Sequence, residues 1–143
     1  MDKQQDILDQ LQQLTAELRS QFFQQLAPDL PGLSAMHSRL LLILATTPGT
    51  TAQQLVEILR RDKAQITRLL NDLQNAALLQ RQPDPADGRR QLLVLSAAGI
   101  ELAAELKAKK RQIAGKMLLG LTAGQQQQAA ETLTLMYQNL VRQ

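Results

Sequence analysis

The chain has 143 residues, a net charge of +3 and 44% apolar residues, of which very few are aromatic. This length fits one ordinary domain whose core must be built mainly from Leu and Ala. The absence of Cys and the presence of a single His exclude disulfides, thiolate chemistry, zinc fingers and histidine-rich metal sites. No apolar run approaches the ~20 residues of a membrane span, and the polar start MDKQQDILDQ is unlike a signal peptide. We therefore expect a soluble, cytoplasmic protein that does not bind membranes.

The charge is unevenly distributed along the chain. Residues 1–59 carry a net charge of −3, whereas residues 60–90 and residues 91–143 carry +3 each. A basic face on a small domain attracts polyanions such as DNA. The alternative is an ordinary solvated surface with scattered basic side chains.

The first 26 residues have apolar side chains at steps of three and four, which predicts one long amphipathic helix. Its apolar stripe contains Ile7, Leu8, Leu11, Leu14, Leu18, Phe22 and Leu26. Pro28 and Pro31-Gly32 predict the end of this helix. Ser34 is then the expected N-cap of a second helix, which stops before Pro48-Gly49.

Two short helices joined by a tight turn are predicted next. Thr51 and Gln54 form a capping box at the start of the first, and Asp62 is the expected N-cap of the second. The side chains expected to be buried in the first are Leu55, Ile58 and Leu59, and those in the second are Ile66, Leu69, Leu70 and Leu73. This pattern predicts a helix-turn-helix. The alternative is an ordinary helical hairpin in a bundle.

The periodicity changes after residue 78. Residues 79–82 and 91–95 predict two short strands, and the turn-rich segment PDPADGRR between them predicts a long, charged tip. A hairpin that directly follows a helix-turn-helix is the arrangement of a winged helix.

Two further helices are predicted in the last third of the chain. Ser96 is the expected N-cap of a helix over residues 97–119. We expect its basic run from Lys107 to Lys116 on a solvated face, with long-range attraction to DNA as the alternative. Gly120 interrupts the chain, and Thr122 and Gln125 form another capping box. The last helix, to about residue 141, has an apolar face formed by Ala129, Ala130, Leu133, Met136, Tyr137, Leu140 and Val141.

The first and last helices have long apolar stripes that the winged unit alone does not cover. We expect them to pack together and against a second copy of the chain. The alternative is that they close back onto their own domain. The residues expected in the dimer interface are Ile7, Leu11, Leu14, Leu133, Met136 and Leu140.

Three motifs within residues 55–99 occur at a specific spacing. They are T-R-L-L-x-x-L from Thr67 to Leu73, D-P-x-D-x-R from Asp84 to Arg89, and L-S-x-x-G ending at Gly99. This segment resembles the winged-helix core of MarR-type transcriptional regulators, and the resemblance extends over nearly the whole chain. The chain departs from the family at Ala77, where Gly is usual. A positive φ at Ala77 would cost about 1 kcal/mol.

The resemblance implies a mostly α fold with a small β-hairpin wing, in which residues 33–96 form a winged helix-turn-helix and residues 1–30 and 97–143 form a helical dimerisation region. It also implies a homodimeric, sequence-specific DNA-binding transcriptional regulator, usually a repressor that responds to a small, often aromatic, ligand. The residues that bind such a ligand stay unassigned, and no cofactor or metal is expected. Dimer symmetry predicts a pseudo-palindromic operator on double-stranded DNA.

We expect the start of the second short helix to read base edges in the major groove. Gln65 suits adenine, Lys63 and Arg68 suit guanine or phosphate, and Ala64 and Thr67 suit a thymine methyl group. For Thr67 the alternative is a hydroxyl satisfied by its own helix. Thr51 and Gln53 are candidate phosphate contacts at a helix N-terminus, with capping alone as the alternative.

At the wing, the resemblance places Arg89 at the minor groove and favours a phosphate contact for Arg90. Asp87 is expected to orient Arg89 through a bidentate pair, with a mobile charged loop as the alternative. We expect His37 to be a surface or hydrogen-bonded helix residue rather than part of a ligand crevice.

No nucleophile–base pair, carboxylate dyad or phosphate-binding Gly loop can be assembled from these motifs, so we expect no enzyme. The remaining alternative function is a winged-helix adaptor that binds protein and not DNA.

Overall fold

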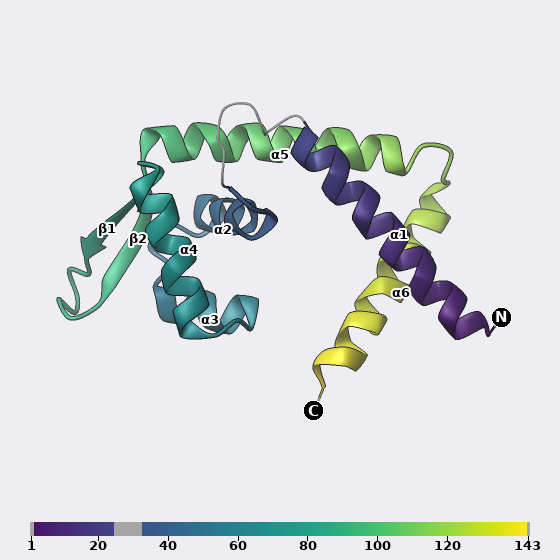
Figure 1. The fold of residues 1–143 in the computed structure, drawn as a ribbon, viewed down its shortest axis with the longest axis horizontal. Coiled ribbons are helices and arrows are strands. Elements are labelled where there is room, and N and C mark those ends of the chain that lie inside the picture. The colour runs from purple at the N-terminus through teal and green to yellow at the C-terminus, as the bar shows by residue number, and fades with distance from the viewer. Residues whose placement is uncertain (1, 25–32, 143) are drawn as a thin grey trace. The chain divides into compact units, whose positions relative to one another are not determined.

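The computed structural model describes residues 2–24 and 33–142. The elements follow the chain in the order α1 (Lys3–Gln24), α2 (Ala35–Thr46), α3 (Ala52–Leu59), α4 (Lys63–Asn75), β1 (Leu79–Pro83), β2 (Gln91–Leu95), α5 (Ala97–Met117) and α6 (Ala123–Val141) (Figure 1). The predicted mostly helical fold with a β-hairpin wing is therefore confirmed. The predicted end of the first helix, at Leu26, Pro28 and Pro31-Gly32, lies outside the described residues.

The chain divides into two compact units, residues 1–110 and residues 111–143. The first unit contains the helix-turn-helix, the hairpin and most of α5. The second contains the end of α5 and all of α6.

Leucine side chains from several elements form the core of the first unit. The largest fully buried side chains are Leu40, Leu41, Leu55, Ile66, Leu70, Leu73, Leu93 and Leu106. They come from α2, α3, α4, β2 and α5, so this core fixes the two short helices against the sheet. The prediction that Ile58 is buried is wrong, because its side chain is 49% exposed. The buried residues of α3 are Leu55 and Leu59, and Ala52 and Val56 are partly buried against the same core, so the core covers the side of the helix away from Ile58.

The predicted helix starts are confirmed by their backbone hydrogen bonds. Thr51 and Gln54 satisfy each other's backbone N–H groups at the start of α3, and Thr122 and Gln125 do so at the start of α6. Asp62 accepts a hydrogen bond from the backbone N–H of Gln65 at 2.7 Å. These bonds satisfy amide groups that have no partner within the helix. Ser34 is likewise the N-cap of α2.

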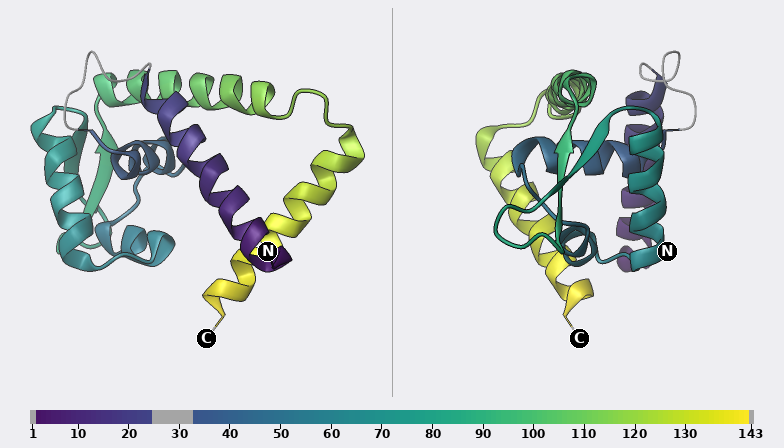
Figure 2. Two further views of the ribbon diagram at one scale, coloured as in Figure 1. Left: turned by 45° about the vertical axis from the view of Figure 1, so that its right-hand side comes forward. Right: turned by 90° about the vertical axis from the view of Figure 1, so that its left-hand side faces the viewer.

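The wing is a two-stranded antiparallel sheet, visible beside α4 in Figure 1 and in both views of Figure 2. Leu79 lies opposite Leu95, and Pro83 lies opposite Gln91. Backbone N–H of Leu93 also donates to the carbonyl of Thr50 at 2.9 Å, which ties the start of α3 to the sheet.

The chain turns sharply between α4 and β1. Ala77 has φ 61°, which confirms that this position needs the left-handed conformation in which Gly is favoured. The hydroxyl of Ser96 donates to the Ala77 carbonyl at 2.7 Å and accepts from the backbone N–H of Gly99 at 3.1 Å. Ser96 therefore caps α5, as predicted, and also fastens its start to the end of α4.

Large apolar side chains are exposed on the terminal helices. No residue of α6 is buried, and the exposed fractions are 50% for Leu133 and 87% for Leu140. On α1, Ile7 is 47% exposed and Leu14 is 44% exposed. These helices therefore carry apolar surface that the single chain leaves in contact with solvent.

Candidate nucleic-acid interface

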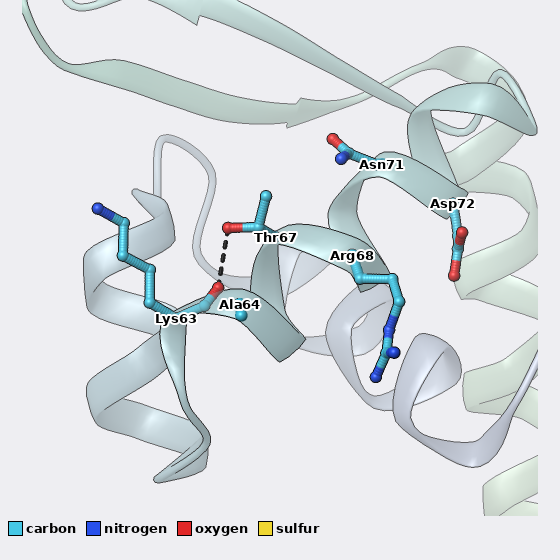
Figure 3. A pocket seen from close by; sticks show the side chains of 6 residues that line it. All are labelled: Lys63, Ala64, Thr67, Arg68, Asn71 and Asp72. Carbon is cyan, nitrogen blue, oxygen red and sulfur yellow. Dashed lines mark hydrogen bonds between the residues drawn. The ribbon is translucent and has the colours of Figure 1, made fainter.

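One face of α4 is polar and open to solvent. Six side chains at helical spacing line a shallow depression of about 580 Å³ on this face: Lys63, Ala64, Thr67, Arg68, Asn71 and Asp72 (Figure 3). The opposite face of the helix carries the buried stripe from Ile66 to Leu73. Because the buried stripe fixes how the helix is rotated about its axis, the polar face must point outward.

The structure brings together four of the five residues predicted to read DNA from α4. Lys63, Ala64, Thr67 and Arg68 all line the depression and are exposed. Gln65 is half-buried and does not line it. The backbone N–H of Gln65 is instead engaged by the N-cap.

The hydroxyl of Thr67 donates to the carbonyl of Lys63 at 2.8 Å (Figure 3). This confirms the alternative interpretation, in which the helix itself satisfies that hydroxyl. The hydroxyl proton is therefore unavailable to a phosphate in this conformation, whereas a methyl contact does not require it.

Thr51 and Gln53 lie at the N-terminus of α3 and outside the depression. Thr51 is only 7% exposed, and its hydroxyl accepts a hydrogen bond from the backbone of Gln54. Gln53 is exposed, and its side-chain amide lies 3.5 Å from a carboxylate oxygen of Glu57. The capping role of Thr51 is thus confirmed, and phosphate contacts by these two residues stay predictions.

The tip of the wing is shaped by two aspartates. Asp84 accepts from the backbone N–H of Ala86 at 2.9 Å, and Asp87 accepts from that of Arg89 at 3.1 Å. The motif D-P-x-D-x-R therefore builds its own turn, since each carboxylate bonds an amide two residues further on. Arg90 joins the two turns through backbone bonds to Asp84 and Asp87.

The Arg89 side chain is 93% exposed and is held by one ionic contact, from Nε to Oδ1 of Asp87 at 3.4 Å. The predicted bidentate pair is wrong. Only Gly88 lies between the two residues, and the same carboxylate oxygen of Asp87 accepts from both the backbone N–H and Nε of Arg89, so the ionic contact is single. An exposed contact of this kind stabilises the fold by ~0–1 kcal/mol, so its effect is to limit where the guanidinium lies.

Sequence reasoning missed Arg81, which joins the wing to α4. Its Nε donates to the side-chain oxygen of Gln74 at 2.9 Å, and its Nη2 donates to that of Asn71 at 2.9 Å. The sequence did indicate which way Arg81 points. Side chains alternate between the two faces of a strand, and Arg81 lies two residues after the buried Leu79, on the same face of β1.

His37 is buried and hydrogen-bonded, which confirms one of the two environments expected for it. Its Nδ1 accepts from the backbone N–H of Ser34 at 2.8 Å, and its Nε2 lies 2.9 Å from Oδ2 of Asp72. The link to α4 joins residues 35 positions apart, so no local pattern could predict it.

The prediction of a fully solvated basic run on α5 is wrong at Lys109, which is 7% exposed. Lys109 follows Leu102 and Leu106 at helical spacing and so falls on the buried stripe. Its Nζ has no hydrogen-bond partner within the described part of the chain, and burial lowers the pKa of this amine.

Within residues 2–24 and 33–142, no group of three or more His, Asp or Glu side chains could hold a metal ion. None of the helices formed by those residues combines the length and apolar character that a membrane span requires.

Residues 32–90 match the family model described as "MarR family". The transcriptional regulator HosA of Escherichia coli O111:H- is 32% identical over 76 residues, which are 53% of this chain and 56% of that protein. The chain thus spans about half the length of this curated relative.

Several solved structures share the fold. FabT of Streptococcus pneumoniae in complex with DNA has a TM-score of 0.84 at 19% identity, covering 95% of this chain and 96% of FabT. MepR of S. aureus, also in a DNA complex, has a TM-score of 0.80 at 20% identity, covering 91% and 93%. A probable transcriptional regulator from Pseudomonas aeruginosa has a TM-score of 0.77 at 27% identity, covering 94% and 99%.

Proposed function

We propose, because residues 32–90 of this chain match the model of the MarR family, that it is a member of this family: a sequence-specific DNA-binding transcriptional regulator and not an enzyme. The observation that carries this proposal is the solvent-exposed polar face of α4, with Lys63 and Arg68 on it. A helix of this kind fits the major groove and presents such side chains to base edges. FabT and MepR, which share the fold, are described in complexes with DNA.

In this proposal each part of the winged helix has a defined contact. Lys63 and Arg68 bind guanine or phosphate, and the methyl groups of Ala64 and Thr67 contact thymine. Gln65 contacts adenine from the edge of the same helix. The proposed phosphate contacts are Thr51, Gln53 and Arg90. Arg89, held by Asp87, enters the minor groove, where a narrow A·T tract concentrates negative potential.

The functional molecule in this proposal is a homodimer. Apolar side chains of α1 and α6 form the interface. Four of them are exposed in the single chain (Ile7, Leu14, Leu133 and Leu140) and two are half-buried (Leu11 and Met136). Burying a Leu that is 50% or 87% exposed removes apolar surface from water, which favours association. Two equivalent α4 helices then require a pseudo-palindromic operator with half-sites about 34–36 Å apart.

We further propose that the chain represses transcription in the cytoplasm and releases DNA when it binds a small, aromatic effector. This part rests on the family resemblance alone. Genomic DNA that flanks the gene and contains an inverted repeat would support it.

Duplex binding and its salt dependence test the proposed function. The affinity should fall steeply with salt, since each neutralised phosphate contributes about −0.9 to the slope of log K against log [salt]. Arg89→Ala should weaken binding by about tenfold without changing the helix content measured by circular dichroism. Arg142→Ala removes the same charge from the end of α6 and should leave affinity within about twofold.

Equal affinity of the Arg89→Ala and Arg142→Ala variants would contradict the proposed role of the wing. A chain that binds no duplex even at low ionic strength would instead support the adaptor, which needs no DNA affinity.

A further inference from the structure

Among the helices within residues 2–24 and 33–142, three begin with a capping box, and one of the three uses a histidine. At α3 and α6 the third helical residue is Gln54 or Gln125, whose side-chain oxygen accepts from the N-cap amide. At α2 the same task falls to His37. A capping glutamine would satisfy Ser34 equally well. The additional capability of an imidazole is a second ring nitrogen on its far side.

The geometry around His37 fixes the role of each ring nitrogen. The backbone N–H of Ser34 can only donate, so Nδ1, at 2.8 Å, must accept and carries no proton. Nε2 therefore carries the proton of the neutral ring and donates to Oδ2 of Asp72 at 2.9 Å. The His37 side chain is 5% exposed, whereas that of Asp72 is 49% exposed. The bond thus joins a buried side chain of α2 to a carboxylate on the solvent-exposed face of α4.

Asp72 is the acidic residue among the six that line the depression of α4. A carboxylate on a face that approaches phosphates opposes binding, because like charges repel. Its hydrogen bond to His37 indicates a structural role instead, which is to hold α4 against α2. A hydrogen bond from another element to a side chain on the helix surface is directional, whereas apolar contacts are not. Such a bond therefore restricts rotation about the helix axis more sharply than apolar packing does.

We propose that His37 is a positioning residue for DNA recognition, which sets the rotation of α4 by donating from Nε2 to Asp72 while its Nδ1 caps α2. The inference rests on the proposed function. The first half of α4 then contacts DNA, while the bond from His37 of α2 to Asp72 holds its second half in place. Without this bond the buried stripe still keeps the polar face outward but limits rotation less sharply, so α4 spends less time in the reading orientation and its apparent affinity falls in proportion. Non-specific affinity is set by charge and should not change.

His37→Gln tests this directly, because glutamine keeps the capping box and removes the bond to Asp72. We expect about tenfold weaker binding to a duplex selected for tight binding by the unaltered chain, and unchanged binding to an unrelated duplex. A purely structural defect would lower the unfolding midpoint without changing the ratio of the two affinities. An unchanged ratio in a folded His37→Gln chain would overturn the inference.

Two variants of Asp72 separate the hydrogen bond from the charge. Asp72→Asn and Asp72→Ala both remove the negative charge, but only Asn keeps an oxygen that can accept from Nε2. Asp72→Asn should retain the ratio of selected to unrelated affinity, and Asp72→Ala should reduce it about tenfold. Combining His37→Gln with Asp72→Ala should add no further loss, because both remove the same bond. If the two substitutions instead reduced the affinity ratio independently, the proposed link between His37 and Asp72 would be overturned.

The ring nitrogens give a readout that does not depend on DNA. His37 is the single histidine in the sequence, so its ¹⁵N signals need no assignment. For the neutral ring we expect a bare Nδ1 and a protonated Nε2, whose hydrogen exchanges slowly with water in the unaltered chain and quickly in Asp72→Ala. The opposite tautomer would overturn the inference.

Failure of the unaltered chain to bind any duplex would overturn the proposed function as well, whereas equal specificity of His37→Gln and the unaltered chain would overturn this inference alone.

Discussion

Two residues other than glycine adopt positive φ in the described part of the chain, and both lie just after a helix of the helix-turn-helix. Arg60 follows α3 with φ 54°, and Ala77 follows α4 with φ 61°. A side chain with a Cβ atom is strained in this conformation by roughly 1–2 kcal/mol. The surrounding bonds hold Ala77 there, since its carbonyl accepts from Ser96 and its N–H donates to the carbonyl of Gln74.

Replacing Ala77 with Gly should raise the free energy of unfolding by about 1 kcal/mol, because glycine adopts φ 61° without strain. Urea denaturation followed by circular dichroism measures this change. Ala76→Gly is the matched control, since Ala76 has φ −82° and should gain no stability. A loss of stability in Ala77→Gly, or equal effects in the two variants, would show that φ does not limit stability here.

At the scale of elements, α5 begins by packing closely against the backbone at Leu78, between α4 and β1. A Cβ atom built on Gly99 would lie 2.1 Å from the carbonyl oxygen of Leu78, which itself accepts from the backbone N–H of Ser96. The oxygen belongs to the backbone at the start of the hairpin, so it cannot move aside without shifting β1. The L-S-x-x-G motif thus sets the spacing between the wing and α5.

Gly99→Ala should lower the free energy of unfolding by roughly 1–3 kcal/mol, because the new methyl group forces these two backbones apart. Gly115→Ala in the same helix is the control, since a Cβ atom there meets nothing within 4 Å. That substitution should instead stabilise α5 by roughly 0.5–1 kcal/mol. Thermal or urea denaturation of both variants provides the test, and a stable Gly99→Ala chain would refute the close contact.

Local chemistry made most elements predictable from sequence. The caps at Ser34, Thr51, Asp62 and Thr122 depend on residues within three positions of each other, and the helix starts agree with the prediction. The wing tip was predictable for the same reason.

The parts that could not be predicted depend on contacts between distant segments. The bond between His37 and Asp72 and the bonds from Arg81 to α4 need the tertiary fold. Ile58 was misplaced because helical periodicity does not reveal which side of Leu55 and Leu59 the core covers, and it covers the side of Ala52 and Val56. Lys109 was misplaced because its charge suggested solvent, although its spacing from Leu106 places it on the buried face.

At the scale of the whole molecule, both terminal helices carry exposed large apolar side chains. Leu133 and Leu135 on α6 are 50% and 55% exposed, but only Leu133 belongs to the stripe predicted to face a second copy. The two residues are therefore a matched pair that differs in the side of the helix.

Leu133→Asp should dissociate the proposed homodimer, because a charge buried without a partner in an apolar interface is strongly unfavourable. Leu135→Asp should leave the dimer intact. Sedimentation velocity over a range of protein concentrations distinguishes the two outcomes. A Leu133→Asp chain that stays dimeric and binds DNA would exclude this face of α6 from the interface.

The central claim is that two copies of this chain bind one DNA duplex. It is tested most directly by measuring the stoichiometry and the salt dependence of binding to a duplex that contains an inverted repeat. Sedimentation of the protein with labelled duplex should show two chains on each duplex, with affinity that falls linearly on a log–log plot against salt. A single chain that shows no affinity for duplex DNA at low ionic strength would contradict the account.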